Sequence, residues 1–297
     1  MANRGIASSV LRRALPPRLR LQIYRLRALG AAGYVRHRRR QQTLPDVPRP
    51  QADAPYDIGG LAPIVLPEPV VNGFAVHFVD RGSGTAELDA FKRLAAGRRT
   101  FIDVGAAGGL FAAAFCALTG NTAYAFEPSP RNFARMQSVI AANPELAIAP
   151  FNIALGAKAG ALAVNASHGL QFRGVLDAAG DTASSPEAET MTVETLDAFV
   201  AAHGIAPDFA KVDVEGMELE VLRGGARTFS SSIDALMLEL HPKMLMGGAS
   251  VADAQALLES FGFKLMTLDM RPIADLTRYV AERRGRAARA ANLVCCK

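Results

Sequence analysis

The sequence predicts a doubly wound α/β fold, in which a mostly parallel sheet carries helices on both faces and ends in an antiparallel strand. Two observations support this prediction. From Thr100 onward, short apolar segments alternate with longer segments of helical periodicity, and a glycine-rich turn follows the first of them. Such alternation is typical of parallel strands joined by covering helices. The chain has 297 residues, 50% of them hydrophobic, so we expect a single folded domain with an appendage.

The expected elements follow in regular order along the chain. Residues 71–79 should form a strand or hairpin, and the amphipathic residues 85–96 should form a helix that leads into the sheet. The sheet strands are expected at 101–104, 122–126, 147–151, 209–214 and 235–240, and further helices at 110–118, 131–142 and 217–222. Residues 263–268 and 292–296 are expected to pair as the terminal antiparallel strands.

Charge and proline content divide the chain before this fold begins. Residues 1–50 contain twelve arginines, no lysine and one acid, a net charge of +11, and since the whole chain carries +5, the remainder carries −6. Seven of the seventeen prolines lie between Pro45 and Pro69, which favours an extended linker along the surface. We therefore predict a basic tail at 1–50, a linker at 51–69 and a folded domain at 70–297.

The basic tail is expected to be partly helical or disordered. Arginines interrupt each of its apolar runs, so neither a secretory signal nor a membrane span is expected, and we predict a cytoplasmic protein. Cys116, Cys295 and Cys296 lack the spacing of a metal or redox motif, which fits a reducing compartment. The tail could contact an anionic membrane surface, an acidic partner or nucleic acid, or it could be a solvated leader.

The glycine-rich turn at residues 103–109 follows the first expected sheet strand. Ligands of open α/β sheets bind at such carboxyl ends, and glycines there permit a tight turn and close approach of a ligand. A dinucleotide-binding site requires a second glycine where this chain has Ala107. The backbone amides of such a site face a pyrophosphate. Asp103 instead favours a cationic ligand. S-adenosylmethionine, which carries an ammonium and a sulfonium, meets this requirement.

Glu127 follows the next expected strand and lies 22 residues after Gly105. An acid at this place can accept hydrogen bonds from both hydroxyls of a ribose. Nicotinamide-binding sites have the same spacing between glycine and acid. The alternative is an exposed glutamate that caps the turn before Pro128.

The block at residues 211–216 places Asp213 and Glu215 at the end of a further strand. Alternate strand residues share a face, so both carboxylates would point the same way if the strand continued that far. One could accept the proton of an acceptor hydroxyl while the other orients an amine, or the acids could only cap the next helix. His241 and His168 are further candidates for the base. No two histidines have metal-ligand spacing, so no metal site is predicted.

Five segments in order resemble the FkbM family of methyltransferases: residues 101–106, 125–128, 152–156, 193–197 and 211–218. The resemblance covers roughly residues 85–297 and implies a Rossmann-like methyltransferase domain that transfers a methyl group from S-adenosylmethionine to a hydroxyl. It implies that Asp213 and Glu215 line the reaction site and that Asn152 lies near the adenosine or the methyl group. The predicted cofactor-binding residues are Asp103, Gly105, Ala106, Gly109, Glu127, Asn152 and Asp213. Family members often have Asn-Ile-Gly where this chain has residues 107–109.

The sequence thus predicts an O-methyltransferase acting on a small sugar, glycolipid or secondary metabolite. The catalytic candidates are Asp213, Glu215 and His241, and residues 165–190 could cover the acceptor. Three alternatives remain open. A nicotinamide-dependent oxidoreductase would need the full glycine motif, a nucleic-acid methyltransferase could use the basic tail for phosphates, and a non-catalytic protein could keep the fold to bind a partner.

Overall fold

The structure is a computed structural model and describes residues 52–53, 55–56, 64–68, 70–71, 84–165, 188–283 and 290–297. One compact unit spans Pro50–Lys297. The predicted basic tail, His168 and most of the predicted acceptor-covering segment lie outside the described residues.

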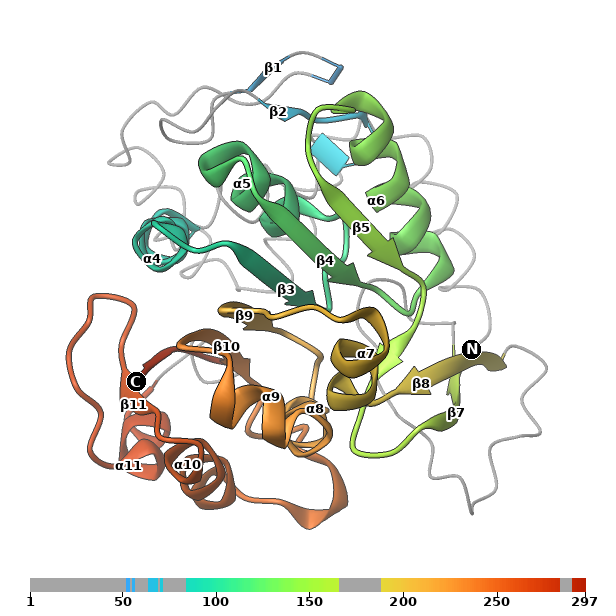
Figure 1. Cartoon of the computed structure of the whole chain (residues 1–297). Coiled ribbons are helices and arrows are strands. Elements are labelled where there is room, and N and C mark those ends of the chain that lie inside the picture. The colour runs from blue at the N-terminus through green and yellow to red at the C-terminus, as the bar shows by residue number, and fades with distance from the viewer. Residues whose placement is uncertain are drawn as a thin grey trace, which may run out of the picture. The chain divides into compact units, whose positions relative to one another are not determined.

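A seven-stranded sheet forms the centre of this unit, in the order β11-β12-β10-β9-β3-β4-β5 (Figure 1). Its strands are β3 (Thr100–Val104), β4 (Thr122–Phe126), β5 (Ile148–Phe151), β9 (Phe209–Val212), β10 (Ala235–Leu240), β11 (Lys264–Met266) and β12 (Ala291–Cys296). The five strands from β5 to β10 are parallel, whereas β12 runs antiparallel to both of its neighbours. The predicted fold class is therefore confirmed. The chain builds outward from β3 to β5 and then returns to β9, so the order reverses between β3 and β9.

Helices cover both faces of the sheet (Figure 1). One apolar cluster joins the first face to α4 (Gly84–Ala95), α5 (Leu110–Thr119) and α6 (Pro130–Ala142). The second cluster joins the other face to α7 (Leu196–His203), α8 (Glu218–Gly224), α9 (Ala226–Ser231), α10 (Val251–Ser260) and α11 (Leu276–Ala281). Phe101 and Phe209 lie in the first cluster, and Ile102 and Ala210 in the second, because successive strand residues point to opposite faces. A short 3₁₀ turn, η3 (Met246–Gly248), precedes α10.

Local signals in the sequence account for several helix ends. Ser129 accepts a hydrogen bond from the amide of Asn132 and Pro130 occupies the first turn, so α6 begins there. α5 ends at Gly120, whose φ of 70° suits a residue without a side chain. The helices predicted at 85–96, 110–118, 131–142 and 217–222 are each present within two residues of the predicted bounds.

The proline-rich segment was expected to be a surface linker, and the structure corrects this expectation. β1 (Pro55–Tyr56) pairs with β2 (Ile64–Val65), and Ile64 and Leu66 are fully buried in the first apolar cluster. Asn143 anchors this segment, since its side chain accepts a hydrogen bond from the amide of Val65 at 2.7 Å and donates one to its carbonyl at 2.9 Å. The folded unit therefore begins before Val70.

Two further differences concern strands. Val71 is helical rather than the start of the expected strand at 71–79, whose other residues lie outside the described ones. A second, three-stranded sheet forms from β6 (Ala154–Leu155), β7 (Gly160–Asn165) and β8 (Ala188–Glu194), in the order β6-β8-β7. Among the described residues, no helix is long and apolar enough to cross a bilayer.

Candidate functional site

Charged side chains gather on one face of the sheet, at the carboxyl ends of four neighbouring strands. Asp103 lies in β3, Glu127 follows β4, Asp213 follows β9, and Glu239 lies near the end of β10. Each stands an even number of residues after a strand residue of the first apolar cluster, so strand alternation directs all four to the same face. The topology therefore brings together residues that are more than a hundred positions apart.

The glycine turn is shaped by contacts within the protein. Gly105 has a φ of 80°, and a Cβ placed on it would lie 1.9 Å from the carbonyl oxygen of Asp213. Gly109 has a φ of 75°, and its Cβ would lie 2.7 Å from Cγ of Met136. The amides of Gly105 and Ala106 both donate to the carbonyl of Phe126. The close approach that requires these glycines is thus an approach of the chain to itself, which differs from the reason inferred from the sequence.

Asp103 is almost fully buried, with 1% of its surface exposed. Its Oδ2 accepts a hydrogen bond from the amide of Ala112 at 3.1 Å, and its Oδ1 is buried with no hydrogen-bond partner among the described residues. Burial raises the pKa of Asp103 to about 7, although the nearby ammonium of Lys211 opposes this shift. An orphaned carboxylate oxygen at this position fits a cationic ligand such as S-adenosylmethionine.

Glu127 is buried and held by two backbone amides. Oε2 accepts from Ala107 at 2.8 Å, and Oε1 accepts from Ser129 at 2.9 Å. Burial raises the pKa of Glu127, although these two amides favour the charged form. Each carboxylate oxygen can accept two hydrogen bonds, so the carboxylate keeps acceptor capacity for a hydroxyl pair.

Asn152 fixes the loop that carries Glu127. Its side-chain amide donates to the carbonyl of Glu127 at 2.8 Å and to that of Pro128 at 3.0 Å. Asn152 is itself exposed, so its place beside the loop comes from these bonds rather than from burial.

Lys211 is a residue of β9 and stands next to the carboxyl end of the strand. Its Nζ donates to Oδ2 of Asp213 at 2.9 Å and lies 4.8 Å from the centre of the Phe111 ring. Burial disfavours the ammonium, yet the carboxylates of Asp213 and Glu87 outweigh burial and raise the pKa of Lys211. The lysine therefore stays charged and orients Asp213.

His241 is buried at the end of β10 and faces several carboxylates. Its Nδ1 lies 2.6 Å from Oε1 of Glu218, while its Nε2 lies 3.6 Å from Oε2 of Glu215 and 3.8 Å from Oε1 of Glu239. Although burial disfavours the imidazolium, the bond to Glu218 and the surrounding carboxylates raise the pKa of His241 to about 9. Burial and the charge of Asp213 raise the pKa of Glu239 to about 8.

The predicted extension of β9 to residue 214 is wrong, because the strand ends at Val212. Glu215 adopts a φ of 52°, and Gly216, with a φ of 108°, passes so close to Met244 that a Cβ would lie 2.3 Å from its carbonyl oxygen. Strand alternation therefore does not set the direction of Glu215. Its carboxylate nevertheless reaches the cluster around His241.

Sequence reasoning named neither Lys211, Glu218 nor Glu239 as a site residue. The period-two spacing from Asp213 to Lys211, and from His241 to Glu239, was a usable signal for two of them. Glu218 is different, because only the folded structure shows that it is fully buried and bonded to both His241 and the amide of Gly216.

Comparison with known proteins gives a family match. A family model described as Methyltransferase FkbM domain matches residues 103–265. The methyltransferase FkbM of Methylobacillus flagellatus KT is 17% identical with a TM-score of 0.44, and the match covers 67% of this chain and 43% of that chain. The magnesium protoporphyrin IX methyltransferase of Synechocystis PCC 6803, solved with bound SAM, is 13% identical with a TM-score of 0.41, with 93% and 95% covered. No curated protein matches this chain.

Proposed function

This chain belongs to the FkbM family of methyltransferases, whose model covers more than half of it, and we propose that it methylates a hydroxyl group of a small-molecule acceptor. The methyl donor is S-adenosylmethionine, the cofactor that the sequence predicted. The observation that best supports the proposal is the direct contact between the glycine turn and the end of β9, at Gly105 and Asp213. A donor held at the turn and an acceptor held at β9 would be neighbours.

Asp103, Glu127 and Asn152 are the residues we assign to the cofactor. The orphaned Oδ1 of Asp103 and the surrounding acids favour a positively charged ligand, and Glu127 has acceptor capacity for the hydroxyls of a ribose. Asn152 holds the loop of Glu127 in place. S-adenosylmethionine supplies a methyl group that is already activated by its sulfonium, so alignment of the acceptor is the main task of the protein.

Asp213 is the proposed proton acceptor at neutral pH. An imidazole with a pKa of about 9 already carries a proton at pH 7, so His241 would have to lose it before it could act as a base. Lys211 fixes the orientation of Asp213 through the bond to Oδ2. The acceptor is proposed to be a sugar, a glycolipid or a secondary metabolite.

The test is the formation of S-adenosylhomocysteine from S-adenosylmethionine with a panel of hydroxylated acceptors, from monosaccharides to glycolipids. With an active acceptor, Asp213→Asn should lower kcat by about 10²-fold or more while affinity for S-adenosylhomocysteine stays within a few-fold. Asp234→Asn is the matched control, because Asp234 directly precedes β10, at the amino ends of the parallel strands and away from the site. It forms an exposed pair with Arg98. Equal kcat values for wild type and Asp213→Asn would refute the assigned base.

A further inference from the structure

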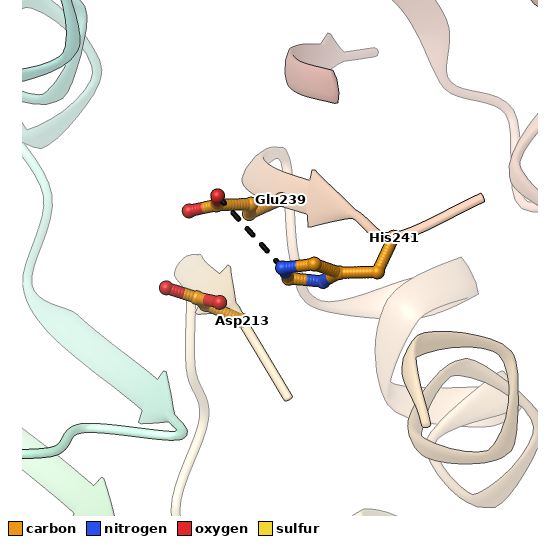
Figure 2. Close-up of side chains that lie close together, drawn as sticks. All are labelled: Asp213, Glu239 and His241. Atoms are coloured by element: carbon orange, nitrogen blue, oxygen red, sulfur yellow. Dashed lines mark ion pairs between the residues drawn. The ribbon is translucent and has the colours of Figure 1, made fainter. Parts of the chain in front are cut away.

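Three side chains from the ends of two adjacent strands converge on one point. Asp213 follows β9, Glu239 lies in β10 and His241 follows it, and Figure 2 shows the three facing one another. Each offers one ligand atom, and these atoms all lie within 4.8 Å of one another. We propose that these three residues bind a divalent transition-metal ion such as Mn²⁺ or Zn²⁺.

The spacing of the ligand atoms suits an ion after a small contraction. Metal–ligand bonds of about 2.0–2.2 Å place two ligand atoms at most about 4.4 Å apart. The Nε2 of His241 and the Oε1 of Glu239 lie 3.8 Å apart, within this limit. The widest pair of the cluster, at up to 4.8 Å, needs to close by a few tenths of an ångström. Rotation of the Asp213 or Glu239 carboxylate supplies such a movement.

His241 is oriented as a metal-binding histidine is. Its Nδ1 is bonded to the fully buried Glu218, which directs Nε2 into the cluster. Metal-binding histidines commonly bond a carboxylate through the ring nitrogen that does not bind the ion. The Nε2 atom lies beyond hydrogen-bond distance of both Glu215 and Glu239, and only 7% of the side chain is exposed. A buried ring nitrogen thus points at the proposed ion position without a hydrogen bond to either acid.

The Glu239 carboxylate supports the same position. Its side chain is 19% exposed, and its Oε1 lies 3.8 Å from Nε2 of His241, which is longer than a hydrogen bond. A carboxylate oxygen and an imidazole nitrogen at this separation are spaced as two ligands of one ion are. The Glu215 carboxylate, 3.6 Å from Nε2, is near enough to serve as a further ligand.

The ligand types select the class of ion. Imidazole favours zinc, iron, nickel and copper, whereas carboxylates also accept manganese and magnesium, so one histidine with two acids favours Mn²⁺ or Zn²⁺ over Mg²⁺ or Ca²⁺. This proposal departs from the sequence prediction of no metal site, which considered spacing between histidines. A set with one histidine and acids from two strands has no such spacing.

The role of the ion rests on the proposed function. A cation at this point would coordinate the acceptor hydroxyl and lower its pKa. In that case Asp213 would hold the ion through one carboxylate oxygen, and the other oxygen would take the proton of the hydroxyl. Binding of the ion, however, can be measured without any methyl transfer.

The test is a titration of the metal-stripped full chain with MnCl₂, followed by electron paramagnetic resonance, with ZnCl₂ and MgCl₂ as competitors. Wild type should bind one Mn²⁺ that Zn²⁺ displaces more readily than Mg²⁺ does. His241→Gln and Glu239→Gln should each weaken binding by about tenfold or more. The control is Glu145→Gln, which removes an exposed acid outside the cluster and should bind Mn²⁺ as wild type does.

Two results would overturn the inference: no Mn²⁺ binding by wild type, or equal binding by wild type and His241→Gln. The first would mean that the cluster holds no ion, and the second that Mn²⁺ binds at another place. Circular dichroism melting curves of each variant establish that the fold is retained. Binding of S-adenosylhomocysteine is measured separately, so that loss of the metal site and failure of the proposed function are distinguished.

Discussion

The two halves of the charged face are built differently. At the ends of β3 and β4, Glu127 is held by two amides and its loop is tied by Asn152. At the ends of β9 and β10, His241 lies 3.6 and 3.8 Å from the acids of Glu215 and Glu239. The first half is fixed by hydrogen bonds to the backbone, whereas the second keeps charged groups close together. We therefore propose that the first half binds the cofactor and that the second half carries the reaction chemistry.

The largest loss of stability is expected from Gly105→Ala, because the glycine turn joins the two halves of the charged face. A Cβ would lie 1.9 Å from the Asp213 carbonyl oxygen, so the free energy of unfolding should fall by about 4 kcal/mol or more. Gly120→Ala is the control. Its φ of 70° is similar, but no other atom of the described part of the chain lies within 4 Å of a Cβ placed on it, so the change should cost only about 1 kcal/mol. Equal losses in urea denaturation would show that the turn tolerates a displacement.

The next effect concerns the charge of Asp103. The pKa of Asp103 is about 7 in the folded protein and near its ordinary value of 3.8 when unfolded, so its contribution to stability is full below pH 3.8 and is lost as the pH rises through 7. Asp103→Asn should therefore stabilise the cofactor-free protein at pH 8, on the order of 4 kcal/mol, with the gain shrinking toward pH 4. Urea denaturation across this range measures the gain. A gain independent of pH would contradict the buried charge.

A smaller effect is expected in the second half, from Glu218→Gln. The bond to Glu218 is the strongest contribution that raises the pKa of His241, so its neutralisation should lower that pKa from about 9 toward 6.5. NMR titration of the imidazole in metal-stripped protein follows the change. Glu259→Gln, at the end of α10, is a control that should leave the pKa of His241 as it is. An unchanged value in Glu218→Gln would mean that other acids hold the proton.

The smallest effect is expected from Asn152→Ala. It removes two hydrogen bonds to carbonyls at an exposed position, so stability should fall by about 1 kcal/mol. Affinity for S-adenosylhomocysteine should fall a few-fold, because the loop of Glu127 loses its tie. Calorimetric titration measures the affinity. A loss as large as that from a change at Glu127 itself would mean that Asn152 contacts the cofactor directly.

Prediction from sequence succeeded where local signals fix the structure. The bounds of β4 and β10 agree with those predicted, because both strands are short apolar runs with polar residues or turns at their ends. Prediction failed where contacts between residues far apart in the sequence determine the structure. Nothing local shows that Ile64 is buried against the first apolar cluster, or that Met244 forces the turn at Gly216. Asp103 was predicted as a site residue because it stands in a local motif, the end of a strand before a glycine turn. The role of Glu218 depends on contacts that only the folded structure shows.

Calorimetric titration with S-adenosylhomocysteine, beside NAD⁺, tests most directly the claim that the β3 and β4 ends bind the cofactor. Wild type and Glu145→Gln should bind S-adenosylhomocysteine and not NAD⁺. Glu127→Gln should bind S-adenosylhomocysteine about tenfold or more weakly, because one acceptor oxygen is lost and the charge is removed. Binding of NAD⁺ by wild type, or equal affinity for S-adenosylhomocysteine in wild type and Glu127→Gln, would contradict the claim.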